Sequence, residues 1–347
     1  MGQPPLDQRR RDVLKALIQL HIASGEPIGS ESLSRLLERR LSSATLRHIM
    51  ADLEGMGYLD HPHTSAGRVP TDDGYRVYVD SLLEPETLRR RDAEAIESEL
   101  ARDAAPRALL DAASRLLSRL SGNVGFVLAP HLDGATFRHI DLVRLPHPRV
   151  LVVMVARTGL VTSKVIEVEE ELGPDELLAC ANYLNHHFAG LTLAGIRAQL
   201  LELMRREQAL YDALLKRVLA VGRQAFAPAE EGGDVILGGA SNVLRIPEFG
   251  DLQRMRTLLS TLEEKGRLVR ILNACLSGNG VRIVIGHEMP DPDLSELALV
   301  AARYPVDGDS VWGLGVVGCP RMAYGRVIAL VDHMARAVSR TLRSLEA

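Results

Sequence analysis

The strongest constraint on the fold is a set of three short amphipathic segments at the start of the chain. Residues 9–23 place apolar side chains at helical spacing, and a second short segment begins with Ser30 as its predicted N-cap. The third segment starts at Ser42 or Ser43 and ends at Gly55. Its apolar side chains fall at i, i+3, i+4 and i+7: Leu46, Ile49, Met50 and Leu53. Three helices in this order predict a helix-turn-helix.

The face of the third segment opposite this stripe carries side chains suited to nucleic acid. Ser43 and Thr45 lie near its N-terminus, where free backbone N–H groups and the helix dipole favour a phosphate. Arg47 and His48 follow within the next turn, at positions from which side chains reach base edges in a major groove. We therefore expect all four side chains to contact DNA.

Two short extended pieces around a small-residue turn follow, and they predict a hairpin, the wing of a winged helix. The tip is expected between His63 and Arg68, and His63 is also expected to contact DNA. Arg68 would enter a minor groove or touch phosphate, and Thr64 and Ser65 would hydrogen-bond the DNA backbone. Thr71 is the predicted N-cap of a fourth helix.

Charge alone does not indicate a nucleic-acid partner. The chain has a net charge of −4, and its first 80 residues carry ten Lys/Arg and eleven Asp/Glu, a net of −1. Phosphate contact is a local requirement, so the basic side chains would have to lie on one face. Three-helix bundles with an arginine on the third helix also occur in proteins that never touch DNA. Periodicity by itself leaves both interpretations open.

The remainder of the chain mixes strand-like and helix-like stretches. Helices are expected over 86–120, 174–188, 193–221, 252–265, 267–276 and 324–345, and strands over 123–128, 137–145, 150–155, 160–168, 281–285, 297–304 and 310–317. A glycine-rich break lies at residues 231–239. Strands, then helices, then strands indicate one α+β domain interrupted by an insertion.

Composition excludes several classes of protein. The longest apolar run, residues 150–156, is far shorter than the roughly 20 residues of a membrane span, and no apolar signal segment follows Met1. Cys180, Cys275 and Cys319 lie far apart, which fits a reducing cytosol and neither a disulfide framework nor a zinc site. We therefore expect a cytoplasmic protein without a membrane partner.

One motif imitates a dinucleotide site. Gly313, Gly315 and Gly318 match G-x-G-x-x-G after a predicted strand. A dinucleotide site also needs a helix that opens inside the motif and an acidic residue about 20 positions later. Here Cys319-Pro320 breaks the chain instead. We interpret the glycines as close packing in a strand and turn.

Other chemical constellations are absent from the sequence. His186 and His187 are adjacent on a predicted helix and so face different directions, and His61 and His63 have no cysteine or further histidine nearby. No G-x-S-x-G, H-E-x-x-H or P-loop spacing occurs. The sequence therefore predicts no catalytic residue, no metal and no cofactor.

Longer blocks of sequence carry a family resemblance. The segment PHTSAGRVPTDDGYRVYVD (62–80) closely resembles the HrcA family of heat-inducible transcription repressors. Four further segments resemble the same family: GEPIGSESLS (25–34), LSSATLRHIMADLEGMGYL (41–59), ILGGASNVLRIPEF (236–249) and VVGCPRMAYGRVI (316–328). The resemblance implies a homodimeric repressor of chaperone operons that binds an inverted-repeat operator. It also implies that the chaperonin promotes the DNA-binding form.

The resemblance further implies an α+β layout with three parts. Carried onto this sequence, they are a winged-helix DNA-binding domain over 1–84, a GAF-like antiparallel-sheet domain over 85–171 and 276–347, and an inserted dimerisation segment over 172–275. The recognition helix is then Ser43–Leu53 and the wing Pro62–Pro70. Two positions depart from the family pattern: His48 stands where Asn is usual, which would alter base preference, and Cys319 where Pro is expected.

Two other functions remain open from the residues. A ligand-sensing regulator would bind a small molecule in the GAF-like domain, and this requires a pocket with a few convergent polar groups. An enzyme with an attached DNA-binding domain would require a catalytic constellation. A filled core argues against the first, and a missing catalytic cleft against the second.

Overall fold

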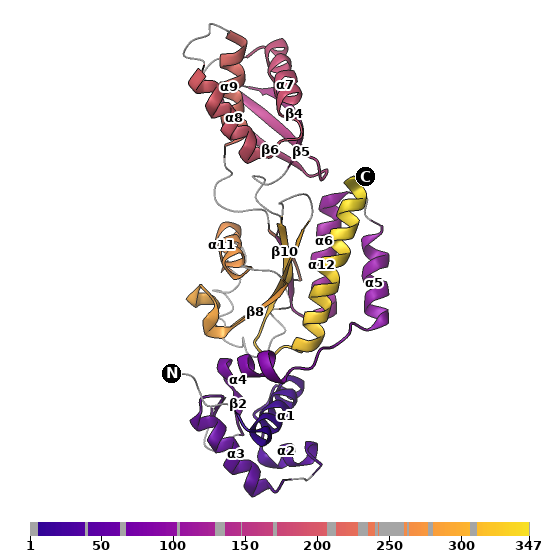
Figure 1. Cartoon of the computed structure of the whole chain (residues 1–347), viewed down its shortest axis with the longest axis vertical. Helices are drawn as coiled ribbons and strands as arrows, with labels where there is room; N and C mark the ends of the chain where they lie inside the picture. The colour runs from indigo at the N-terminus through magenta and orange to yellow at the C-terminus, as the bar shows by residue number, and fades with distance from the viewer. Residues whose placement is uncertain are drawn as a thin grey trace.

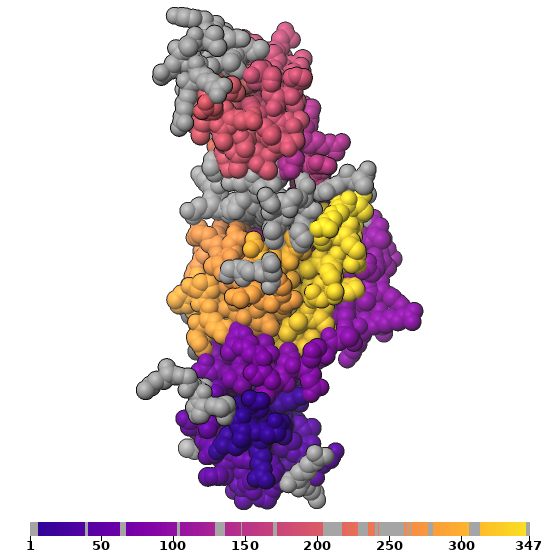
Figure 2. All heavy atoms as spheres, in the orientation of Figure 1, coloured from indigo at the N-terminus to yellow at the C-terminus, as the bar shows by residue number. Residues whose placement is uncertain are grey.

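The structure is a computed structural model that describes residues 6–38, 41–62, 67–102, 105–128, 136–146, 148–168, 172–206, 213–227, 235–239, 242, 260–261, 264–276, 280–305 and 311–346. The fold is α+β, and the sheets in these ranges are antiparallel. Figure 1 shows an elongated molecule in three tiers, with helices and a hairpin at one end, a five-stranded sheet in the middle and a three-stranded sheet at the other end. The surface view follows the same order (Figure 2).

The N-terminal region consists of short helices and a two-stranded hairpin. Its elements are α1 (Gln8–Ser24), α2 (Ser30–Leu36), α3 (Ser43–Gly55), β1 (Leu59–Asp60), β2 (Val69–Pro70) and α4 (Asp72–Val77), which continues as a π-helical turn (Tyr78–Leu82). Asp7, Ser42 and Thr71 each accept a backbone N–H from the first turn of the helix that follows. Gly29, and not the predicted Ser30, is the N-cap of α2.

The predicted apolar stripes of this region are buried. One core contains Val13, Leu14, Leu17 and Ile18 of α1 together with Leu46, Ile49, Met50 and Leu53 of α3. Burial of each such side chain stabilises the fold by roughly 1.5–3 kcal/mol. Helix propensities differ by less than about 1 kcal/mol per residue, so packing of these stripes decides where the helices lie.

The middle tier is a five-stranded sheet buried on both faces. Its strands, in spatial order, are β7 (Val235–Gly238), β3 (Val124–Leu128), β10 (Val311–Gly318), β9 (Ala298–Pro305) and β8 (Val281–Ile285). The helices are α5 (Arg90–Leu100), α6 (Pro106–Ser121) and α12 (Tyr324–Glu346) on one face and α11 (Lys265–Cys275) on the other (Figure 1). Between β8 and β9 lie two 3-10 turns, Gly286–Glu288 and Pro292–Leu294.

The single helix expected over residues 86–120 is instead two helices. The first, α5, ends at Leu100, and α6 begins with Pro106 in its first turn. Proline lacks an N–H group, and its ring clashes with the preceding helical turn, so it starts a helix far more readily than it continues one. Residue 106 therefore separates two stretches with helical periodicity.

The third tier is a separate unit with its own core. Its elements are β4 (Phe137–Leu145), β5 (Arg149–Ala156), β6 (Val161–Glu167), α7 (Pro174–Phe188), α8 (Leu193–Arg206) and α9 (Ala213–Ala225). Strands and helices share one hydrophobic cluster, in which the ring of Phe137 meets that of Phe226 edge-on at 5.5 Å. The expected boundary between residues 171 and 172 cuts through this core. The described residues that share this core run from residue 137 to 226, between β3 and β7.

Strand β7 is not among the strands expected from the sequence. It pairs with β3 and places Gly238 opposite Gly125. A side chain at either glycine would overlap the backbone of α6 around Ser114. The glycine-rich stretch therefore contains a strand, β7, that packs closely on α6. The sequence alone suggests only a break between elements there. Most of the helix expected over 252–265 lies outside the described residues.

Candidate nucleic-acid interface

The candidate interface is the outward face of α3. Thr45, Arg47 and His48 are exposed on it and Ser43 is half-buried, while the opposite face lies in the core. The Ser42 hydroxyl caps the helix: it accepts the Thr45 N–H at 3.1 Å and lies 2.9 Å from the Thr45 hydroxyl. The structure thus places the four predicted α3 residues at one end of one helix.

The two larger side chains of this face contact only their own helix in the interactions that the structure records. Arg47 Nε donates to the Ser43 carbonyl at 3.3 Å. His48 is 81% exposed, and its Nε2 lies 4.0 Å from the Asp52 carboxylate one turn later. Both side chains are therefore presented to solvent from a rigid, capped helix.

Two acidic side chains on α3 are each paired with an arginine from a neighbouring element. Arg10 of α1 donates to Asp52 at 2.6 Å, and Arg68 Nε donates to Glu54 at 2.6 Å. The hydrogen bond from Arg10 is the main reason that the pKa of Asp52 lies below its ordinary value. These pairs reduce the negative charge beside a surface that would meet phosphates, and they tie α3 to α1 and to the hairpin.

The hairpin has short strands, with Leu59 opposite Pro70 and Asp60 opposite Val69. Three predicted contact residues, His63, Thr64 and Ser65, lie outside the described residues. Arg68 lies at the end of the hairpin loop, directly before β2, and its contact with DNA stays a prediction.

Two backbone hydrogen bonds hold Arg68 there. Arg68 N–H donates to the Ile28 carbonyl at 2.9 Å, and Ile28 N–H donates to the Arg68 carbonyl at 2.8 Å. A side chain at the preceding Gly67 would overlap the Ile28 carbonyl, so close approach of the backbones requires glycine at that position.

Replacing Arg68 by alanine is expected to lower the free energy of unfolding by about 1 kcal/mol, because a partly buried charged hydrogen bond is lost. Urea denaturation followed by circular dichroism measures the change. The control is Arg35→Ala, which removes an exposed pair with Glu31 within α2 and should cost no more than ~0.5 kcal/mol. Equal losses for the two variants would show that the Arg68–Glu54 contact does not anchor the hairpin.

Sequence reasoning does not identify Arg10, Asp52 and Glu54 as parts of this surface. Arg10 and Asp52 are 42 positions apart, and no periodic pattern links them. The available signal is the presence of two acids on a helix proposed to meet phosphates, since each requires a nearby cation. Only the packing of α1 and of the hairpin on α3 shows which cation serves which acid.

Other candidate chemistry is sparse. Within the described residues, no group of three or more His, Cys, Asp and Glu side chains is placed to hold a metal ion, and no helix has the length and apolar content to cross a membrane. Cys180 and Cys275 are buried, and burial raises the pKa of each thiol to about 11. Both cysteines therefore act as small apolar core residues.

Comparisons with known proteins give the class of the chain, a transcription repressor. A protein of Geobacter sulfurreducens named heat-inducible transcription repressor HrcA is 42% identical over 345 residues, covering 97% of this chain and 98% of the relative. Its namesake in Syntrophobacter fumaroxidans is 39% identical over 341 residues, covering 97% of each. The family model described as the HrcA protein C terminal domain matches residues 107–328.

The chain belongs to the HrcA family of heat-inducible transcription repressors. A solved structure described as a hypothetical protein at 2.2 Å resolution has a TM-score of 0.65 and 22% sequence identity, and the similarity covers 98% of this chain and all of that one. At that identity the likeness concerns the fold alone, and it extends over the whole chain.

Proposed function

We propose that the N-terminal region is a winged helix-turn-helix that binds operator DNA, with α3 as the recognition helix. The observation that carries the proposal is the capped, outward face of α3, on which Thr45, Arg47 and His48 are exposed together. Ser43 and Thr45 would meet phosphates at the helix N-terminus, and Arg47 and His48 would reach base edges.

The hairpin would serve as the wing. His63, Thr64 and Ser65 would contact the DNA backbone at its tip. Arg68 would hold the wing against α3, because its Nε is already bonded to Glu54. This divides the expected DNA residues into base-reading residues on α3, backbone contacts at the wing tip and one positioning arginine directly before β2.

We propose further that the middle tier is the GAF-like domain, formed by residues 85–128 and 235–347, and that residues 137–226 form the inserted dimerisation unit. The two halves of the GAF-like domain meet where β3 pairs with β7 and β10. The inserted unit lies at the end of the molecule opposite α3 (Figure 1). One end would thus read DNA, and the other would join two copies.

The outer face of the three-stranded sheet supports dimerisation. The apolar side chains of this face are Val143, Leu151, Val153, Val155, Val161 and Val165, and His139, Asp141 and Ser163 lie among them. Val161 and Val165 are 60% and 52% exposed, whereas the alternate residues of β5 are buried against the helices. A second copy would cover such a face, and a two-fold pair presents two recognition helices to an inverted repeat.

Replacing Val165 by lysine is expected to raise the dissociation constant of the dimer about tenfold or more, equivalent to ~1.4 kcal/mol. In a two-fold interface the charge is introduced twice, which makes the effect larger than in a one-sided contact. Sedimentation velocity over a concentration series measures it. The control is Leu178→Lys on α7, an equally exposed apolar residue on another surface of the same unit. A dimer weakened only by Leu178→Lys would move the interface to α7.

The repressor would act in the cytoplasm as a non-enzymatic regulator of chaperone operons, with the chaperonin promoting its DNA-binding form. Fluorescence anisotropy tests this directly. The protein is titrated with an inverted-repeat duplex and a scrambled duplex over a salt series, with and without chaperonin. Salt-sensitive preference for the repeat that improves with chaperonin is the expected result. Absence of preference under every condition would overturn the proposal.

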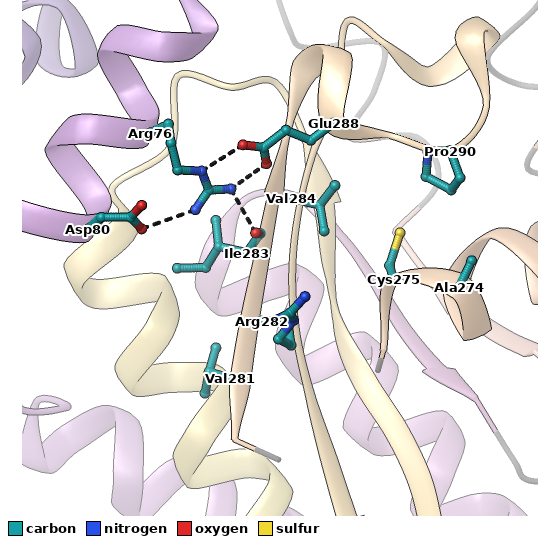
Figure 3. Close-up of a pocket in the computed structure, with 10 residues that line it drawn as sticks. All are labelled: Arg76, Asp80, Ala274, Cys275, Val281, Arg282, Ile283, Val284, Glu288 and Pro290. Carbon is teal, nitrogen blue, oxygen red and sulfur yellow. Dashed lines mark hydrogen bonds and ion pairs between the residues drawn. The ribbon is translucent and has the colours of Figure 1, made fainter. Parts of the chain in front are cut away.

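A small-molecule-sensing regulator is the second candidate. A cavity of about 620 Å³ between α4 and β8 favours it, since ligand sites have volumes of roughly 300–1,000 Å³ (Figure 3). However, Arg76 in this cavity donates hydrogen bonds to Asp80 and Glu288. These three polar side chains therefore bond one another and do not point at a ligand position. The described geometry therefore favours the repressor without a bound effector.

A further inference from the structure

The N-terminal region is packed directly on the middle tier. One continuous hydrophobic cluster extends from α1 and α3 through α4 to α12 and the five-stranded sheet. At its centre the rings of Tyr75 and Tyr324 lie 6.1 Å apart, and both residues are buried. Residues 83–89, which link the two tiers along the chain, form no helix or strand. The contacts described below, and not the linker, therefore fix the angle between the tiers.

The polar centre of this junction is Arg76 of α4 (Figure 3). Its Nε donates to Glu288 at 2.7 Å, its Nη2 donates to the other Glu288 oxygen and to the Ile283 carbonyl at 2.8 Å, and its Nη1 donates to Asp80 at 3.2 Å. The two-pronged contact fixes the orientation of both side chains. Partial burial raises the pKa of Glu288, but hydrogen bonds from Arg76 and the Ile285 N–H outweigh this and hold the pKa below its ordinary value.

A second contact joins the start of α4 to the turn after β8. The Asp72 carboxylate accepts the backbone N–H of His287 at 3.0 Å and lies 3.2 Å from its Nδ1. The preceding Gly286 has φ +54°, and a side chain there would overlap Asp72. The turn thus has the backbone shape that close approach of α4 requires.

A third contact lies on α1. Arg321, just before α12, donates through Nη1 to the Ile22 carbonyl at 3.1 Å, and its guanidinium lies against Gly25. Two of the three contacts use the turn Gly286–Glu288 and the third uses Arg321, and together they hold two helices of the N-terminal region, α4 and α1. Rotation of one tier on the other would break all of them.

We propose that Arg76 and Glu288 are positioning residues for operator binding, which hold α3 at one angle to the rest of the chain and so set the half-site separation that the dimer accepts. The inference rests on the proposed DNA-binding function. Two-fold repressors read half-sites about 34 Å, one helical turn, apart. A rotation at the junction turns α3 relative to the proposed dimer face, and the two-fold axis applies that turn to both copies, so the separation and the relative orientation of the two recognition helices both change.

The test is a series of inverted-repeat duplexes whose central spacer changes one base pair at a time, together with a duplex that carries a single half-site. Arg76→Ala and Glu288→Ala should each weaken binding at the preferred spacing about tenfold and flatten the dependence on spacing. Affinity for the single half-site should stay within about twofold of the wild type. The double variant should lose no more affinity at the preferred spacing than either single variant. Arg76→Lys should recover part of the lost affinity, because lysine keeps the positive charge but cannot make the two-pronged contact.

The matched control is Arg340→Ala, which breaks an ion pair with Glu97 between α12 and α5, away from the junction. It should leave both the affinity and the dependence on spacing unchanged. An unchanged spacing profile in Arg76→Ala would overturn the proposal. Equal loss on half-site and full-site duplexes would also overturn it, because a folding defect or a lost DNA contact weakens both alike.

Hydrogen–deuterium exchange on the DNA-free protein separates failure of this inference from failure of the proposed function. Faster exchange in α4 and in the turn after β8 is expected for Arg76→Ala and not for Arg340→Ala. Unchanged exchange would show that the pair does not hold the junction. If the wild type itself showed no preference for an inverted repeat, operator binding would be the part that fails.

Discussion

Replacing Gly315 by alanine is expected to destabilise the protein by about 3 kcal/mol, the upper end of the usual range for overpacking. Gly315 lies in β10, the middle strand of the five-stranded sheet, opposite Phe126 on one side and Ala301 on the other. An added Cβ would lie 2.7 Å from the Ala301 Cα and would overlap the Val300 carbonyl. These are backbone atoms of a hydrogen-bonded strand, so they cannot move without breaking the pairing of β9.

Urea denaturation followed by circular dichroism measures this loss. Gly55→Ala is the control, because a Cβ at this last residue of α3 would meet nothing within 4 Å and alanine favours helix. A Gly315→Ala variant as stable as the wild type would remove the packing explanation of the G-x-G-x-x-G motif. At the other two glycines an added Cβ would overlap side-chain atoms, of Leu276 at Gly313 and of Asn123 at Gly318, and not backbone.

Replacing Arg47 by alanine is expected to cost roughly 1–3 kcal/mol of binding to the operator, if its guanidinium reads a base edge as proposed. Binding to a scrambled duplex should change much less, because non-specific affinity comes from phosphate contacts. The fold should be unaffected, since Arg47 is exposed and its recorded hydrogen bond is to its own helix. Fluorescence anisotropy against both duplexes over a salt series measures the two effects together.

Arg90→Ala on α5 is the control, an exposed arginine whose ion pair among the described residues is with Glu94 of its own helix. It should leave the affinity for both duplexes unchanged. An equal loss for Arg47→Ala on operator and scrambled DNA, with a smaller salt slope, would identify Arg47 as a phosphate contact. Base reading would then pass to His48, the exposed neighbour on the same face.

Local patterns in the sequence predict much of this structure because their causes are local. The α3 stripe, the start of α3 at Ser42 or Ser43, the cap Thr71 and strand β4 lie where spacing and side-chain chemistry place them. The same holds for the outward position of Arg47, because a helix buried on one side leaves the other to solvent. The longer blocks of sequence predict membership of the HrcA family, and the family model and the named relatives confirm it.

The sequence by itself therefore determined most of the elements, the family and which face of α3 points outward. Only the tertiary structure decided that residues 137–226 form one packed unit, that Arg68 at the end of the hairpin loop bonds Glu54, and that Arg76 bonds Glu288 across the junction. Arg76 and Glu288 are 212 positions apart, and many cations in the chain have equivalent chemistry. Periodicity reports whether a side chain is buried, but its partner depends on how the tiers pack, and no local pattern encodes that packing.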